Sequence, residues 1–99
     1  MRMTYAALAI CAAVISQGPD FAMAGTGYGE ITLVNQTSQV IDLYVDDHYG
    51  CRALAGLTCS TMERAGGHTL TAKTGDGQAA SEVITLDDGG TFTYTITES

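Results

Sequence analysis

Apolar and polar residues alternate with a period of two through most of the chain after Gly29. The clearest case is Ile41, Leu43 and Val45, which are separated by Asp42 and Tyr44. Because successive side chains of a strand point to opposite faces, this pattern predicts strands with one buried face. The predicted strands are residues 30–34, 41–45, 58–63, 68–73, 82–86 and 91–97. No segment after residue 24 has a helical period, so the alternation indicates an all-β fold.

Turn-forming residues separate the predicted strands at intervals of about 8–12 residues. Polar or glycine-rich turns are expected at residues 35–38, 65–67, 74–77 and 87–90. The last of these turns is expected to join residues 82–86 and 91–97 as a hairpin. Short strands at this spacing predict a small antiparallel β-sandwich of about six to seven strands, with a small barrel as the alternative.

Residues 1–24 have the pattern of a secretory signal peptide. Arg2 precedes an apolar run at residues 6–15, and Ala22-Met23-Ala24 offers small residues for cleavage before Gly25. The run is shorter than the roughly 20 residues that a membrane span requires. An alternative is lipidation at Cys11, although Ile10 is larger than the residue such sites prefer and the apolar run continues past Cys11. We therefore expect a periplasmic or secreted protein in which residues 25–99 form a single domain.

Cleavage after residue 24 would leave two cysteines, Cys51 and Cys59. An even cysteine count in a small exported domain predicts one disulfide. A cross-link closing so short a loop is expected to stabilise the fold by roughly 2–3 kcal/mol. The spacing is wider than that of a Cys-x-x-Cys redox motif, and no second Cys or His pair completes a metal site. Both cysteines are therefore interpreted as structural.

The charge of the chain is strongly negative, at −7. After residue 24 the basic residues are Arg52, Arg64 and Lys73, against ten carboxylates. Nucleic-acid-binding proteins carry basic stripes, so we expect no nucleic-acid partner. No cofactor motif is present in the sequence, and none is expected to bind.

Residues 41–96 resemble the PEGA-type β-sandwich domain. The pattern of that family is an apolar strand ending in Val-Asp-Gly, a turn leading into His-x-Leu, and two closing strands. The matching segments are residues 43–47, 65–70 and 86–92. Asp47 stands where the pattern usually has glycine, the letters that name the family do not occur in order, and the cysteine pair is not part of the pattern. The resemblance implies a small extracytoplasmic β-sandwich that acts as an accessory module without catalysis.

Asp46-Asp47-His48 is the densest group of titratable side chains and is a candidate cation site. The alternative is that these residues are solvated or cap backbone amides in a turn. His68 is expected to be a structural histidine, because no nucleophile can be placed beside it. The sequence contains no GxSxG element or repeated carboxylate pair, so we expect the protein not to be an enzyme.

Two further motifs have functional alternatives that the sequence leaves open. Four threonines, at positions 91, 93, 95 and 97, share one strand face, and an ice-binding surface would need such threonines on neighbouring strands as well. Only Thr69 and Thr71 hint at that repetition, so a solvated strand face is the simpler interpretation. Asn35-Gln36-Thr37 has the glycosylation sequon, and in a bacterial protein it is expected to be only a turn.

Residues 50–60 are expected to form a loop held by the disulfide. Tyr49, Arg52, Leu54 and Leu57 lie in or beside it and are the predicted partner-binding residues. Tyr and Arg are frequent in binding hot spots, and a constrained loop loses little entropy on binding. The alternative is that Leu54 and Leu57 cap the core. The sequence therefore predicts an exported, non-catalytic protein that binds an unknown protein through this loop or an edge strand, or alternatively a secreted inhibitor or immunity-type protein presenting it.

Overall fold

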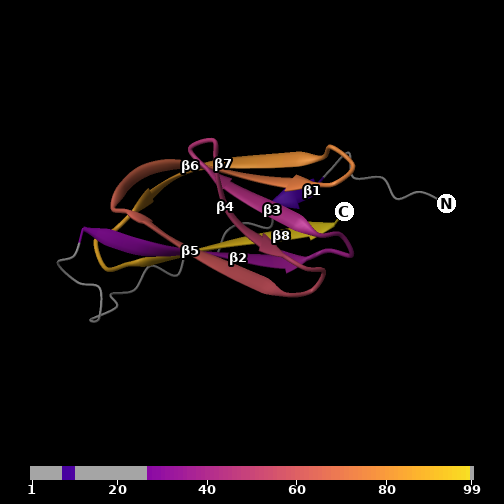
Figure 1. Ribbon diagram of the computed structural model, residues 1–99, viewed down its shortest axis with the longest axis horizontal. Coiled ribbons are helices and arrows are strands. Elements are labelled where there is room, and N and C mark those ends of the chain that lie inside the picture. Colours follow the sequence, from indigo (N-terminus) through magenta and orange to yellow (C-terminus); the bar gives the residue numbers. More distant parts are fainter. Residues whose placement is uncertain (1–7, 11–26, 99) are drawn as a thin grey trace.

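Two β-sheets packed face to face form the molecule (Figure 1). The computed structural model describes residues 8–10 and 27–98. Sheet I has the strand order β1-β8-β2-β5, and sheet II has the order β4-β3-β6-β7. The strands are β1 (Leu8–Ile10), β2 (Tyr28–Gln36), β3 (Ile41–Val45), β4 (His48–Ala53), β5 (Thr58–Arg64), β6 (Gly66–Thr74), β7 (Ala79–Leu86) and β8 (Thr91–Glu98). The predicted all-β sandwich with one disulfide is confirmed.

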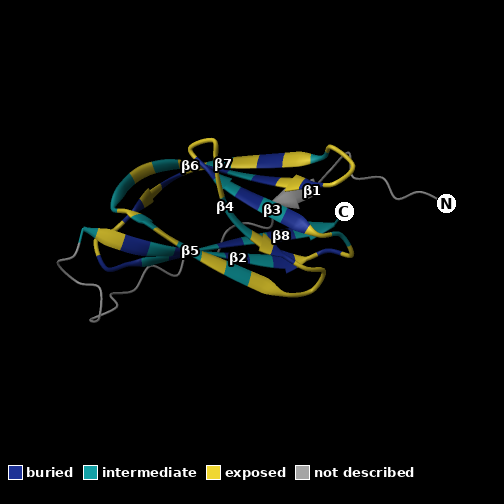
Figure 2. Cartoon of the chain, in the orientation of Figure 1, coloured by how far each residue is buried: buried dark blue, intermediate teal, exposed yellow. Residues whose placement is uncertain are grey.

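The core consists of the alternating apolar residues that identified the strands. In β3, Ile41, Leu43 and Val45 are fully buried, while the residues between them are partly exposed. In β8 the buried positions are Phe92, Tyr94 and Ile96 (Figure 2). The other buried apolar residues are Ile31, Leu33, Ala53, Leu70, Ala72, Ala80, Ile84 and Leu86. Among the residues whose burial the structure describes, the core comes from strands β2 to β8.

The last two strands do not form the hairpin expected from their sequence. Strand β7 pairs with β6 in sheet II, whereas β8 crosses to sheet I and pairs in parallel with β2. Residues 87–90 thus connect the two sheets. Alternation shows which face of each strand is buried but does not identify its neighbour, so the sequence pattern could not reveal this pairing. The sandwich is mostly antiparallel, with this one parallel pair among the described strands.

The segment expected to be a loop at residues 50–60 is mostly strand. Asp46 and Asp47 have positive φ angles of 51° and 70° and form the two-residue turn between β3 and β4. This is the backbone conformation of the tight turns that favour β-hairpins, and Asp tolerates it better than most residues. Because the turn takes only two residues, β4 already begins at His48. It extends to Ala53, and only residues 54–57 separate it from β5.

Gly29 allows β2 to pass close to the connection between the two sheets. A Cβ atom there would lie 2.7 Å from Leu86 Cγ and 2.9 Å from the carbonyl oxygens of Asp87 and Gly90. These distances are shorter than van der Waals contact, so any larger residue would push the connection away. The carbonyl of Gly90 also accepts a hydrogen bond of 2.9 Å from the N–H of Glu30, which starts the β2–β8 pairing.

Residues 8–10, inside the predicted signal peptide, form a short strand on the outer edge of β8. The register is antiparallel, with Leu8 opposite Glu98 and Ile10 opposite Ile96. Strand β1 also lies near β7 of the other sheet. The rest of the predicted signal peptide, including Cys11 and the cleavage site before Gly25, lies outside the described residues. The described residues include no helix with the length and apolar character needed to cross a bilayer.

Candidate functional site

Residues 54–57 form a tight turn that presents two leucines to solvent at one end of the sandwich. The N–H of Leu57 donates a 2.9 Å hydrogen bond to the carbonyl of Leu54. Gly56 has φ of 77°, a conformation that suits glycine in the third position of a type II turn. Leu54 is 53 % exposed and Leu57 is 55 % exposed. The leucines therefore do not close the core, which was the alternative role expected for them.

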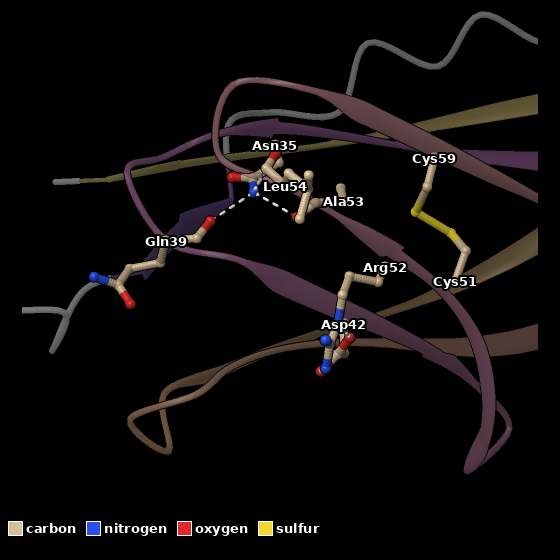
Figure 3. A network of polar contacts seen from close by, with 8 residues as sticks. All are labelled: Asn35, Gln39, Asp42, Cys51, Arg52, Ala53, Leu54 and Cys59. Atoms are coloured by element: carbon tan, nitrogen blue, oxygen red, sulfur yellow. Dashed lines mark hydrogen bonds and ion pairs between the residues drawn. A yellow bond between two sulfur atoms is a disulfide. The ribbon is translucent and has the colours of Figure 1, made fainter.

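Asn35 holds the backbone of this turn through its side-chain amide (Figure 3). Its side-chain NH2 lies 2.7 Å from the Gln39 carbonyl, 3.0 Å from that of Ala53 and 3.1 Å from that of Leu54. Its main-chain N–H donates to the Leu57 carbonyl at 3.0 Å. One fully buried residue of β2 thus holds both ends of the turn and the β2–β3 connection.

The acceptor side of Asn35 is also used. Its Oδ1 accepts hydrogen bonds from the N–H of Thr37 at 3.0 Å and from the Thr37 hydroxyl at 2.7 Å. With 0 % exposure and both ends of the amide bonded, Asn35 has no freedom to accept a glycan in the folded protein. The glycosylation alternative therefore does not apply to the folded chain, and the two sequon residues Asn35 and Thr37 act together as a structural tie.

The disulfide joins β4 of sheet II to β5 of sheet I. Cys51 and Cys59 have a Cα–Cα distance of 6.0 Å and pack partly buried against the core. The cross-link between these two cysteines is confirmed. The disulfide therefore lies between two facing edge strands. The turn at residues 54–57 contains neither cysteine and is held by Asn35.

The four predicted partner-binding residues do not come together. Tyr49 and Arg52 belong to β4 and lie on the outer face of sheet II, where they contact residues of β3. The Arg52 guanidinium makes two hydrogen bonds to Asp42, of 2.8 and 3.2 Å, and the Tyr49 ring meets Tyr44 edge-on at 5.9 Å. A loop at residues 50–60 would have placed them beside the leucines, but the extension of β4 separates the two pairs. Leu54 and Leu57 are the two large apolar residues that the turn exposes.

At the opposite end of the sandwich, the Asp46 carboxylate organises the start of β6. It accepts a 2.8 Å hydrogen bond from the N–H of Thr69 and lies 2.6 Å from Nδ1 of His68. The Thr69 N–H, followed by the His68 side chain, holds the pKa of Asp46 below its ordinary value of 3.8. This is the backbone-capping alternative to the cation site expected from Asp46-Asp47-His48. His48 faces Glu63 instead, with 3.3 Å between Nε2 and Oε2.

His68 joins the two sheets at this end. Nε2 lies 2.6 Å from the carbonyl oxygen of Arg64 in β5, while Nδ1 contacts Asp46. Both partners are acceptors, so both ring nitrogens donate only when the imidazole is protonated. Partial burial opposes the charge, but the hydrogen bonds to Arg64 and Asp46, with the charges of Asp46 and Glu63, raise the pKa of His68 above 6.5.

The threonines of β8 have only a partial match on neighbouring strands. Thr93 lies beside Thr32 of β2, which in turn pairs with Ser60 of β5. Glu30 and Val34 occupy the flanking positions of β2 and interrupt the row. The threonines of β6 at positions 69 and 71, expected to extend the array, belong to the other sheet. On the described residues of sheet I, the threonines of β8 therefore do not continue across β2 as an unbroken array.

No pocket opens on the part of the chain that the structure describes. Over residues 8–10 and 27–98, no three His, Cys, Asp or Glu side chains are grouped so that they could hold a metal ion. Comparisons of the chain with protein-family models, with curated proteins and with solved structures found no match. Function must therefore be argued from the surface geometry.

Proposed function

We propose that the protein is an exported, non-catalytic β-sandwich that binds another protein through the turn at residues 54–57. The observation that carries the proposal is the pair of half-exposed leucines on a turn whose backbone is held on both sides. Exposed aliphatic side chains alone are common on protein surfaces. Here the buried amide of Asn35 holds the backbone of the turn, so less conformational entropy is lost when a partner covers the leucines.

Export is part of the proposal and has two supports. The sequence of residues 1–24 has the arrangement of a signal peptide. The Cys51–Cys59 disulfide forms and persists in oxidising compartments such as the periplasm or the extracellular space. The PEGA-type resemblance is a further expectation in the same direction, since that family consists of extracytoplasmic modules.

A binding experiment with two matched variants tests the turn. Oxidised residues 25–99 are used to capture partners from the exported fraction, with bound proteins identified by mass spectrometry. The double variant Leu54→Ser, Leu57→Ser should lose the specific partner. Val83→Ser is the control, because Val83 is 77 % exposed on β7, far from the turn in the strand order. Equal capture by the wild type and the double variant would refute the role of the turn.

The secreted-inhibitor function is a narrower version of the same proposal. A short turn projecting from a rigid scaffold is suited to insertion into a concave site, and complexes of this kind form with little backbone movement. Its discriminating result is that the captured partner is an enzyme whose activity falls in proportion to the bound protein. An accessory module would leave the activity of its partner unchanged.

A further inference from the structure

We infer that the outer edge of β8 is a self-association surface, at which β8 of a second copy pairs antiparallel once residues 1–24 are absent. The inference concerns a surface other than the turn at residues 54–57. It does not depend on the proposed partner of that turn. It follows from the backbone direction of β8, the composition of the four edge strands and the strand that already lies on part of this edge.

The backbone of β8 directs alternate residues to β2 and to the outside. The Gly90 carbonyl bonds to Glu30 of β2, and in the register of this parallel pair Phe92 also faces β2. Thr91, Thr93 and Thr95 therefore direct their N–H and C=O groups to the outer edge. Among the described residues, no strand pairs with that edge at these three threonines.

Strand β1 shows that the edge accepts an antiparallel strand. Residues 8–10 pair with Ile96, Thr97 and Glu98 at the end of β8. They belong to the segment that the sequence predicts to be cleaved. A chain that begins at Gly25 lacks this strand and leaves β8 at the edge of sheet I. The buried apolar residues of β2 to β8 all remain in that chain.

The composition of β8 differs from that of the other edge strands. Strand β4 carries His48 and Arg52, β5 ends in Glu63 and Arg64, and β7 carries Glu82 on its inner side. Charges on an edge oppose pairing with another chain. Strand β8 has no charged residue from Thr91 to Thr97 and consists of threonine alternating with aromatic or β-branched residues. It is therefore the edge least protected against strand addition.

A second copy of β8 is the occupant that this edge fits best. A two-fold axis at Tyr94 would place Thr93 opposite Thr95 of the second copy and Phe92 opposite its Ile96. Buried residues then continue along one face and threonines along the other, and both types of cross-strand pair are favourable. The pairing is isologous, so it closes as a dimer.

The charge of the chain sets the conditions for this dimer. Arg2 and Asp20 cancel, so residues 25–99 keep the net charge of −7. Two copies repel one another, and Glu98 of each would lie near the Asp87–Asp88 connection of the other. Because residues 91–97 of β8 carry no charge, this repulsion is between groups outside the paired segment and is screened by salt. Dimerisation should therefore strengthen as ionic strength rises.

Analytical ultracentrifugation of oxidised residues 25–99 over a range of concentrations, in low and high salt, tests the inference. The wild type should form a dimer and no larger species. Thr95→Pro removes an outward-facing N–H, which an edge strand tolerates, and should raise the dimer dissociation constant about tenfold or more. Thr95→Ala keeps the N–H and should still dimerise. A monomeric wild type at the highest concentration, or a set of larger oligomers, would overturn the inference.

A charge-swap pair tests the register even if the proline variant does not fold. The variant Thr93→Lys, Thr95→Lys and the variant Thr93→Glu, Thr95→Glu each place like charges opposite one another across the two-fold axis. Each should be monomeric alone, and an equimolar mixture should form the heterodimer. A mixture that stays monomeric while the wild type dimerises would refute the register. The double variant at Leu54 and Leu57 should dimerise like the wild type, which separates this surface from the turn.

Discussion

The two long sides of the sandwich are closed in different ways. On one side β4 faces β5, and four ties to β5 or β4 cross between the sheets: the Cys51–Cys59 disulfide, the His48–Glu63 contact, the contact of His68 with the Arg64 carbonyl and the bonds from Asn35 to the β4–β5 turn. On the other side β7 lies near β1, and the described structure has only the three residues of β1 along the outer edge of β8. The first side is tied within the molecule, whereas on the second the described contact along the outer edge of β8 is limited to β1.

This difference is useful in a domain of this size. A small core leaves little surplus stability, so covalent and polar ties at one side have a large relative effect. The ties also immobilise the turn that carries Leu54 and Leu57. Under the inference above, the outer edge of β8 exchanges β1 for a second copy of the chain, while the ties on the other side stay in place. Four measurements test this difference between the two sides, and the variant expected to lose the most stability comes first.

Replacing Asn35 should do the most damage. Asn35→Ala leaves the carbonyls of Ala53, Leu54 and Gln39 without their amide partner and removes the acceptor for Thr37. Each buried polar group left unsatisfied costs about 1–3 kcal/mol, so a total loss of roughly 3–4 kcal/mol in unfolding free energy is expected. Chemical denaturation measures it, with the exposed neighbour variant Gln36→Ala as control. Equal stability of the two variants would show that the amide is not a structural tie.

Removing the disulfide should have the next largest effect. The double variant Cys51→Ala, Cys59→Ala is expected to lose about 2–3 kcal/mol, because the unfolded chain is no longer constrained. Urea titration of the oxidised wild type, the reduced wild type and the double variant measures this difference. Reduction should affect the wild type and leave the double variant unchanged. If reduction destabilised both equally, the loss would not come from this bond.

The pH dependence of stability should come from Asp46 and His68. The raised pKa of His68 means that its contribution is complete below pH 6.5 and is lost as pH rises through the folded-state pKa. The lowered pKa of Asp46 means that its contribution is complete above pH 3.8 and is lost as pH falls through the folded-state value. Maximum stability is therefore expected between about pH 4 and 6.5.

Thermal unfolding from pH 3 to pH 9 measures that window. His68→Gln should remove the fall in midpoint on the alkaline side, because glutamine does not titrate. His48→Gln is the matched control, since His48 is more exposed than His68 and lies 3.3 Å from Glu63. An unchanged alkaline slope in His68→Gln would show that another group carries the dependence.

Deleting residues 1–24 should have the smallest effect on the fold. Each hydrogen bond of β1 contributes about 1 kcal/mol net, and ordering each of its three residues costs about 1–2 kcal/mol, so the two nearly cancel. Denaturation at low protein concentration, where association is negligible, should give unfolding free energies within about 1 kcal/mol for residues 1–99 and 25–99. A much larger loss of unfolding free energy on deletion would mean that the segment deleted with β1 is a structural part of the sandwich.

The sequence predicted what depends on local pattern. Ile41, Leu43 and Val45 specified a buried strand face, and the two cysteines specified their own cross-link, because each is visible within a few residues. Pairing between distant strands was not predictable. Nothing in residues 82–97 distinguishes a hairpin from two strands in different sheets, so β8 was assigned the wrong neighbour.

The candidate site was predicted in part for the same reason. Leu54 and Leu57 were identified as candidates, but Tyr49 and Arg52 were grouped with them because the early turn at Asp46 was not recognised. The role of Asn35 was missed, since its amide acts on carbonyls 18 and 19 residues further along the chain. Its only local signal was the polar run in which it stands, which resembles any turn.

The parallel contact between β2 and β8 has a consequence for synthesis. Strands β2 and β8 lie side by side although more than 50 residues separate them in the chain. Strand β8 also supplies Phe92, Tyr94 and Ile96 to the core. A nascent chain that stops before residue 91 cannot complete sheet I. Contacts between such distant residues also slow folding. The polypeptide therefore stays incompletely folded until its last residues have been made, which is the state that a chain must keep while it is threaded across a membrane.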